Sequence, residues 1–175
     1  VRMPESTASH QTLVSAMFGR IAPGYDAANR ILSFGVGRLW RRRLVRGVEA
    51  AFKRGSRRRI LDLAAGTYDV SLALVRSVPG ATVIAADFCL PMLKAGPSKL
   101  QGKSASDRPR VLLLAADGPA LPLADESVDA VTVSFGLRNI TPPPQALAPG
   151  LTALPPGVAC HILAFRSPRG RGRAR

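Results

Sequence analysis

The 175 residues of the chain suffice for one domain, and a hydrophobic content of 46% is ordinary for a protein that buries a core. The two cysteines, Cys89 and Cys160, and the two histidines lack the spacing of a zinc site, so we expect neither a disulfide framework nor a metal site. No apolar run approaches the roughly 20 residues that span a bilayer, and the first residues lack a signal-peptide pattern. We therefore expect a cytoplasmic protein.

The net charge of +14 is concentrated in two parts of the chain. In the tail from residue 166, arginine alternates with small residues that have nothing to bury, so we expect disorder there. For the group between residues 38 and 59 three interpretations stay open: a solvated helix face, an anionic membrane surface, or nucleic acid. Nucleic acid is the weakest, because aromatic residues are not interleaved with the arginines and no known nucleic-acid motif appears. The basic residues of this group are Arg38, Arg41, Arg42, Arg43, Arg46, Lys53, Arg54, Arg57, Arg58 and Arg59.

The first third of the chain predicts a helical cap that precedes the core. Residues 1–12 are polar and have no periodicity, so we expect a mobile lead-in. Apolar residues then follow a helical spacing, first over 13–22 and again from Asp26 to Phe52. The predicted division is a lead-in over 1–12, a helical cap over 13–58, a core over 59–168 that forms a single domain with the cap, and a basic tail over 169–175.

From residue 59 the pattern changes to short apolar runs separated by turns and helical stretches. Strands that are apolar on both faces are typical of a parallel sheet covered by helices, so we expect an α/β fold. Helices are predicted over 70–78 and from residue 91 towards 100, where Pro97 threatens the end. Six prolines between 142 and 156 argue against a regular helix over that whole stretch. The predicted strands are 60–65, 82–86, 111–116, 128–133 and 161–165.

Acidic residues stand at or near the carboxyl ends of the first three predicted strands. The second strand ends at Asp87, about 20 positions beyond a glycine-bearing turn, which is the spacing at which a carboxylate meets ribose hydroxyls. The third strand leads into Asp117 and Gly118. Each feature alone also fits a plain turn or a helix N-cap, but together they favour a ligand with a ribose, an adenine amino group and a cationic sulfonium. The turn after the first strand reads Asp62-Leu-Ala-Ala-Gly66-Thr67-Tyr68-Asp69.

The same turn argues against a bound phosphate. A pyrophosphate site needs close glycines at a helix N-terminus, whereas Tyr68 stands where a further glycine is wanted and Asp69 adds negative charge. The turn therefore fits a nucleoside without phosphate.

Two further motifs make the assignment specific. The stretch from Tyr25 through Asp26 and Asn29 to Trp40 resembles the N-terminal signature of the ubiquinone/menaquinone biosynthesis C-methyltransferases of the UbiE type. The hexapeptide Ser134-Phe-Gly-Leu-Arg138-Asn139 resembles the motif that this family carries after its fourth strand. The turn from Asp62 to Asp69 matches the cofactor loop of the family, and the resemblance extends from about residue 13 to residue 168.

The resemblance implies a Rossmann-like class I S-adenosylmethionine-dependent methyltransferase with a mostly parallel sheet. Its cofactor is S-adenosyl-L-methionine, and its substrate is a membrane-resident prenylated quinol, either demethylmenaquinol or the ubiquinol-pathway equivalent, which is methylated on a ring carbon. The fold usually continues with two strands after the fifth, so we expect a C-terminally truncated member that lacks them. A degenerate protein with weak or no catalysis is the alternative. The sequence does not indicate an oligomeric state.

Carried over position by position, the resemblance implies a role for each matched residue. Asp62 and Gly66, with Thr67 beside them, frame the methionine end of the cofactor. Asp87 holds the ribose. The remaining cofactor-binding positions are Asp117 and Gly118 at the adenine and Ser134 in the methyl-transfer pocket.

The catalytic positions implied by the resemblance lie in the two family motifs. Tyr25, Asp26 and Asn29 cover the pocket from the cap, and Arg138 and Asn139 lie at the quinol. Ring methylation needs a deprotonated hydroxyl, and a fixed guanidinium can stabilise the resulting phenolate.

The sequence departs from the family at Tyr68 in the cofactor loop. Tyr68 replaces a glycine of the family, so it either crowds the methionine portion or adopts a positive φ that favours glycine.

The basic segment 38–59 is expected to contact the membrane, because a prenylated quinol resides in the bilayer. We expect this segment to bind anionic headgroups at the inner face of the membrane, with Trp40 at the interface.

Overall fold

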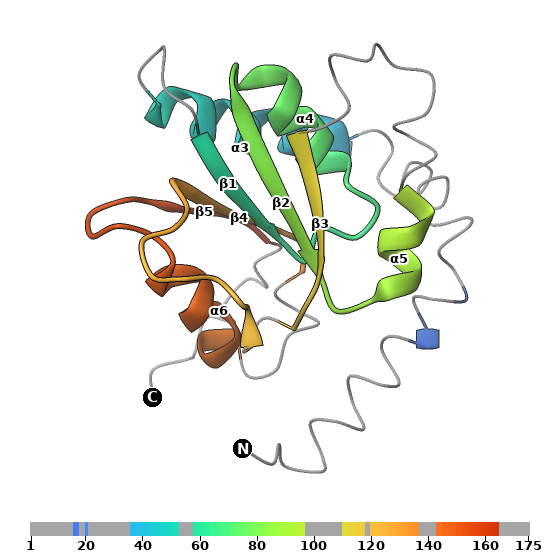
Figure 1. Cartoon of the computed structure of the whole chain (residues 1–175). Helices are drawn as coiled ribbons and strands as arrows, with labels where there is room; N and C mark the ends of the chain where they lie inside the picture. The colour runs from blue at the N-terminus through green and yellow to red at the C-terminus, as the bar shows by residue number, and fades with distance from the viewer. Residues whose placement is uncertain are drawn as a thin grey trace, which may run out of the picture.

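The computed structural model of the chain describes residues 16–17, 20, 36–52, 58–96, 110–117, 120–136 and 143–164. These residues contain a parallel sheet with the strand order β3-β2-β1-β4-β5 (Figure 1). The predicted α/β class is thereby confirmed. The strands are β1 (Arg58–Leu63), β2 (Ala81–Asp87), β3 (Val111–Ala115), β4 (Ala130–Ser134) and β5 (Cys160–Leu163). The longer helices are α3 (Val36–Ala51), α4 (Asp69–Ser77), α5 (Leu90–Ala95) and α6 (Pro143–Thr152).

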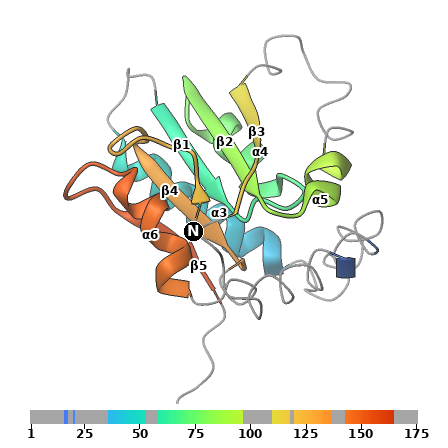
Figure 2. The ribbon, with the colours of Figure 1, turned by 60° about the horizontal axis from the view of Figure 1, so that its bottom comes forward.

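The helices cover both faces of the sheet, because successive strand residues point to opposite sides. Ile60 packs with Val48 of α3 and Leu74 of α4 on one face. Leu61, the next residue, belongs to a second cluster on the other face, where α6 lies. Figure 2 shows this arrangement from another side, with α3 behind the sheet and α6 in front of it. The central strands β1, β2 and β4 are therefore largely buried on both faces, as their continuous apolar sequence predicted, whereas the outer strands β3 and β5 are partly exposed.

Helix α3 is amphipathic and makes up most of the described part of the predicted cap. Leu44, Val45 and Val48 are buried against the core, whereas Arg42 and Arg46 are exposed. Most of the other predicted cap residues lie outside the described part of the chain, and the division into lead-in, cap, core and tail stays a prediction. Among the described helices, none combines the length and the apolar sequence that crossing a bilayer requires.

The proline-rich stretch is helical over only part of its length, as its composition predicted. Helix α6 covers Pro143–Thr152 with Pro149 in its interior, and it ends before Pro155. The paired prolines 143 and 144 are tolerated because they occupy the first turn, where backbone N–H groups have no intrahelical partner. Gly150 lies close to Leu61 of β1, so packing against the sheet offsets the bond that Pro149 removes.

The two-sided burial predicts which leucines hold the fold together. We expect Leu74→Ala to lower the free energy of unfolding by about 2–5 kcal/mol, because the side chain is fully buried between α4 and the sheet. The control is Leu39→Ala on α3, where the side chain is 63% exposed and a change within about 0.5 kcal/mol is expected. Urea unfolding followed by circular dichroism measures both, and equal losses would contradict this packing.

Candidate functional site

The carboxyl edge of the sheet carries the acidic residues that the sequence singled out. Asp62 of β1 pairs with Ala85 of β2, and Asp87 at the end of β2 pairs with Ala115 at the end of β3. Asp117 follows two residues later, and the amide of Ala116 donates a hydrogen bond to the Asp87 carbonyl oxygen at 3.2 Å. The three acids thus lie on neighbouring strands at one edge, where folds of this kind bind ligands.

Asp62 is buried inside this edge and ties three elements together. Its Oδ2 accepts a hydrogen bond from Ser71 Oγ of α4 at 2.5 Å, and its Oδ1 accepts one from Thr132 Oγ1 of β4 at 2.9 Å. Burial raises the pKa of Asp62 to about 6, because the loss of hydration and the nearby Asp87 outweigh the two hydroxyl donors. The carboxyl group therefore links β1, α4 and β4 at the base of the site, and both of its oxygens are already bonded.

Asp87 binds the turn that follows β1. Its Oδ2 accepts a hydrogen bond from the amide of Gly66 and its Oδ1 accepts one from the amide of Cys89, both at 2.8 Å. Burial raises the pKa of Asp87, and the two backbone donors oppose that shift. Each carboxylate oxygen retains a further lone pair, so the group can accept additional hydrogen bonds from a ligand.

The turn between β1 and α4 has a strained backbone. Three alternating residues have positive φ: Ala64 at 57°, Gly66 at 56° and Tyr68 at 65°. The amide of Ala65 donates to the carbonyl oxygen of Ala86 at 3.0 Å, which fixes the turn to the end of β2. The positive φ expected of Tyr68 is confirmed, and for a residue other than glycine it costs about 1–3 kcal/mol.

The segment after β4 lies directly against this turn. Ser134 ends β4 and is half-buried, and the Phe135 amide donates to the Leu163 carbonyl oxygen at 2.7 Å. A Cβ atom on Gly136 would lie 2.3 Å from the Cβ of Ala64, so only glycine fits there. The glycine of the Ser134 motif therefore has a packing role that sequence reasoning missed, although its place in the motif was a signal.

Helix α3 approaches the same edge through two contacts. Arg41 Nη1 lies 3.0 Å from Asp69 Oδ2 in the first turn of α4, and both side chains are partly exposed. The ring of Trp40 packs on Phe135 with centroids 5.9 Å apart, so Trp40 is half-buried at this contact. The exposed ion pair contributes about 0.2–1 kcal/mol, and the ring pair about 0.5–1.5 kcal/mol beyond its buried area.

The other predicted site residues divide into two groups. Thr67 is buried within the turn, and Asp117 is half-buried beyond β3, where its carbonyl oxygen accepts a bond from the Ala120 amide at 2.9 Å. Sequence reasoning missed Ser71 and Thr132, whose signal was a polar residue in an otherwise apolar helix face or strand. The remaining predicted residues lie outside the described part of the chain and are Tyr25, Asp26, Asn29, Gly118, Arg138 and Asn139.

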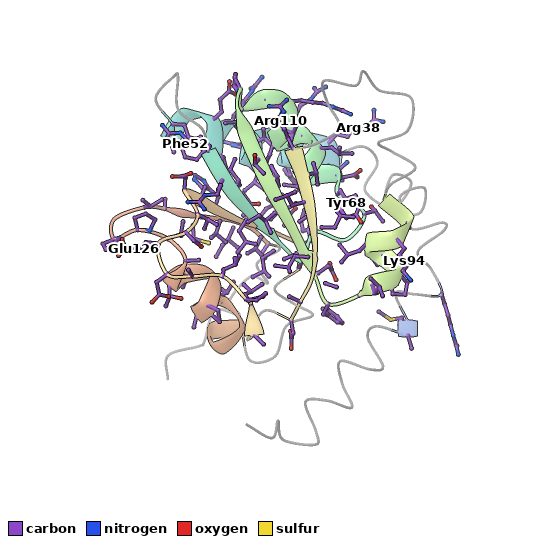
Figure 3. The ribbon with its side chains drawn as sticks, viewed as in Figure 1. Arg38, Phe52, Tyr68, Lys94, Arg110 and Glu126 are labelled. Carbon is purple, nitrogen blue, oxygen red and sulfur yellow. The ribbon has the colours of Figure 1, made fainter. Side chains whose placement is uncertain are left out.

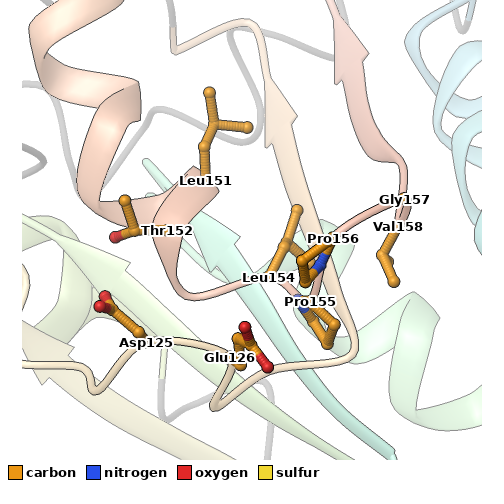
Figure 4. Close-up of a pocket in the computed structure, with 9 residues that line it drawn as sticks. All are labelled: Asp125, Glu126, Leu151, Thr152, Leu154, Pro155, Pro156, Gly157 and Val158. Carbon is orange, nitrogen blue, oxygen red and sulfur yellow. The ribbon is translucent and has the colours of Figure 1, made fainter.

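A separate open pocket of about 410 Å³ lies at the opposite edge of the sheet (Figure 4). It lies between Asp125 and Glu126, which precede β4, and the stretch 154–158, which precedes β5. The amino ends of parallel strands meet at this edge, so the pocket is distinct from the site that Asp87 and Gly66 form.

The motifs around this site have a match among known families. The sequence profile of the ubiE/COQ5 methyltransferase family matches residues 6–171. The chain belongs to the ubiE/COQ5 methyltransferase family. The resemblance to this family that the sequence indicated is thereby confirmed.

Relatives within the ubiE/COQ5 family match over most of this chain. It is 43% identical over 152 residues to a demethylmenaquinone methyltransferase of Thermus thermophilus, which covers 87% of this chain and 66% of the relative. It is 39% identical over 156 residues to the ubiquinone/menaquinone biosynthesis C-methyltransferase UbiE of Geobacter sulfurreducens, covering 89% of this chain and 59% of the relative. The chain thus spans less than two thirds of the length of these two curated relatives.

The fold is shared with solved methyltransferase structures. A SAM-dependent methyltransferase from Aquifex aeolicus superposes with a TM-score of 0.59 and 20% sequence identity, covering 73% of this chain and 68% of that chain. The predicted Rossmann-like class I methyltransferase fold is confirmed by this likeness and by the ubiE/COQ5 family match.

The raised pKa of Asp62 predicts a pH dependence of stability. Between its ordinary value of 3.8 and about 6 the folded chain holds this proton more tightly than the unfolded chain. The stability that the group contributes is therefore fully present below about pH 4 and is lost as the pH rises through 6. We expect the unfolding free energy of Asp62→Asn, relative to the natural chain, to increase by up to about 3 kcal/mol from pH 4 to pH 7.

Urea unfolding at several pH values measures this difference, because effects of the other carboxyl groups are shared by both proteins. Parallel stability curves for the two proteins would contradict the buried position of Asp62.

Proposed function

We propose that the protein binds S-adenosyl-L-methionine and catalyses methylation of a ring carbon of a polyprenylated quinol, either demethylmenaquinol or the ubiquinol-pathway equivalent. The observation that carries this proposal is the buried Asp87 carboxylate, bonded to the amide of Gly66 at the carboxyl edge of the sheet, in a chain of the ubiE/COQ5 family. The names of the relatives from Thermus thermophilus and Geobacter sulfurreducens support the quinol as substrate.

The described residues fit a nucleoside that carries no phosphate. A phosphate group would bind at the N-terminus of α4, but the carboxylate of Asp69 lies in the first turn of that helix and would repel it. Asp87 and Asp117 lie at the same edge of the sheet, and carboxylates are acceptor groups, which suit hydroxyl and amino donors. A positively charged sulfonium is also favoured beside these carboxylates, because unlike charges attract more strongly where water is excluded.

The proposed roles follow the order of the strands across this edge. Asp87 would accept hydrogen bonds from the ribose hydroxyls through its remaining lone pairs. Asp117, with Gly118, would face the adenine. The oxygens of Asp62 already accept hydrogen bonds from Ser71 and Thr132. We therefore propose that Asp62 attracts the positively charged methionine end of the cofactor through its negative charge without bonding to it directly. The residues proposed to surround the methionine end and the transferred methyl group are Gly66, Thr67 and Ser134.

The chemistry of the proposed reaction assigns a task to the quinol-facing residues. When bound, S-adenosyl-L-methionine supplies an electrophilic methyl group on its sulfonium. Arg138 would stabilise the phenolate form of the quinol, which makes the adjacent ring carbon nucleophilic, while the guanidinium itself stays protonated. Asn139 would orient the ring, and Tyr25, Asp26 and Asn29 would cover the pocket from the cap. Alignment of the ring carbon with the methyl group would supply much of the remaining acceleration.

The cofactor proposal predicts a strong effect of Asp87. We expect the natural chain to bind S-adenosyl-L-methionine in calorimetry and to methylate demethylmenaquinol presented in vesicles. Asp87→Asn should weaken cofactor binding at least about tenfold, because the charge-assisted hydrogen bonds to the ribose are lost. In addition, the NH₂ group of the asparagine side chain would face the backbone N–H of Gly66 or Cys89, where two donors cannot bond to each other.

The matched control is Asp125→Asn, which makes the same chemical change at the opposite edge of the sheet and should leave binding unchanged. Unfolding curves without cofactor show whether each variant is folded. Absence of binding by the folded natural chain would reject the proposal in favour of a degenerate methyltransferase.

We also propose that the outward face of α3 contacts an anionic membrane surface from the cytoplasmic side. This face combines exposed arginines with Leu39, whose side chain is 63% exposed. Trp40, expected at the interface, packs instead on Phe135, so Leu39 is the apolar residue best placed to reach lipid. The same contact puts the beginning of α3 beside the end of β4, which would bring the proposed quinol site near the bilayer. The exposed arginines are Arg38, Arg42, Arg43 and Arg46.

The membrane proposal is tested by reversing one charge. Each basic residue near an anionic surface contributes about 1 kcal/mol, so Arg42→Glu should remove about 2 kcal/mol and weaken vesicle binding about 30-fold. Sedimentation with phosphatidylserine vesicles measures the binding. The control is Arg76→Glu, which reverses an exposed arginine in the last turn of α4. Equal binding to neutral and anionic vesicles, or equal effects of the two variants, would contradict a specific α3 surface.

A further inference from the structure

Tyr68 lies in the turn between β1 and α4, residues 64–68, which is the proposed cofactor turn. Its side chain nevertheless points into the protein core. The residue is fully buried, and its ring packs with Leu72 of α4, Ala85 of β2 and Leu93 of α5. Figure 3 shows Tyr68 beside α5. The side chain therefore fills space between three elements of the core.

Gly96, directly after α5, is shaped around this ring. A Cβ atom at position 96 would lie 1.9 Å from Cε2 and 2.1 Å from Cδ2 of Tyr68, well inside any tolerated contact. The backbone of Gly96 has φ −72° and ψ −33°, which every residue adopts readily, so its conformation does not require glycine. The three atoms nearest to that Cβ position all belong to the tyrosine ring, so the ring excludes a side chain at position 96 and the two residues form a size-matched pair.

The contact between Tyr68 and Gly96 is a second connection between the cofactor turn and the segment after β2. The first link is the hydrogen bond from the Gly66 amide to Asp87, and Asp87 also holds the amide of Cys89, which precedes α5. The second link is the Tyr68 ring against Gly96 at the far end of α5. Residues 66–68 are thereby attached both to the end of β2 and to the far end of α5.

We propose that Tyr68 is a positioning residue whose ring, held against Gly96, locks the cofactor turn to α5 and keeps the Gly66 amide on Asp87. This inference rests on the proposed binding of S-adenosyl-L-methionine at that turn. A turn that is already ordered loses less conformational entropy when ligand binds. The contact between Tyr68 and Gly96 therefore increases the affinity for the cofactor, although neither side chain needs to touch it. It also explains how the turn keeps its shape with a tyrosine where the family resemblance leads one to expect a glycine.

The hydroxyl group of Tyr68 is not needed for the contact between its ring and Gly96. It is buried and has no hydrogen-bond partner among the described residues. Burial, with the nearby charge of Asp87, raises the pKa of the Tyr68 hydroxyl to about 12, so it is neutral at physiological pH. Tyr68→Phe therefore keeps the ring and serves as the control for variants that remove it.

The first readout is hydrogen exchange of the Gly66 amide, which needs no cofactor. We expect Tyr68→Gly to speed this exchange at least about tenfold relative to amides of β1, whereas Tyr68→Phe should leave it unchanged. Gly96→Ala should also speed it, because the added methyl group displaces the ring. In the Tyr68→Gly background the Gly96→Ala change should have little further effect, because the ring is gone. Gly66 exchange that is unaffected by loss of the ring would overturn the proposal.

The second readout is calorimetric affinity for S-adenosyl-L-methionine, measured only for variants that unfold cooperatively. Tyr68→Gly and Gly96→Ala should bind at least about tenfold more weakly than the natural chain, and Tyr68→Phe equally well. Tighter binding by Tyr68→Gly would overturn the proposal and mean that the ring obstructs the cofactor. If the natural chain binds no cofactor, the proposed function fails, while the exchange experiment still decides whether Tyr68 locks the turn.

Discussion

The hydrogen bonds of the Asp87 carboxylate hold the candidate site together. One oxygen accepts from Gly66 in the turn after β1 and the other from Cys89 at the start of the next segment, so one side chain defines the positions of both. Burial of this carboxylate is costly unless its hydrogen bonds are made, and two backbone donors offset that cost. The same group is then available, already oriented, to accept hydrogen bonds from a ligand.

Asp62 serves the same edge in a different way. Its carboxyl group lies beneath the turn and joins β1 to α4 through Ser71 and to β4 through Thr132. A fully bonded buried network of this kind specifies one arrangement of the strands, because any shift leaves a polar group without a partner. Helix α3 adds the outer contacts, since Arg41 reaches Asp69 and Trp40 packs on Phe135. The basic surface of α3 and the carboxyl edge of the sheet are thus parts of one packed unit.

The order of the elements could be predicted because the signals for it are local. Apolar runs marked all five described strands to within two residues at every end, and helix α4 was predicted to within one residue at both ends. The acids Asp62 and Asp87 were located at strand ends by the same patterns. For residues 142–156, composition predicted only that a helix would not cover the whole stretch, and helix α6 covers Pro143–Thr152. Only its packing on Leu61 shows that one interior proline is tolerated.

The sequence by itself determined the class of fold, the family, and which acids lie at the carboxyl edge of the sheet, since each depends on neighbouring residues or ordered motifs. Only the tertiary structure decided what those side chains touch. Thr132 lies 70 positions from Asp62 in the chain, and no local pattern encodes their hydrogen bond. Likewise, Gly96 has an ordinary helical backbone, so its need for glycine arises from the ring of Tyr68, which folding brings against it.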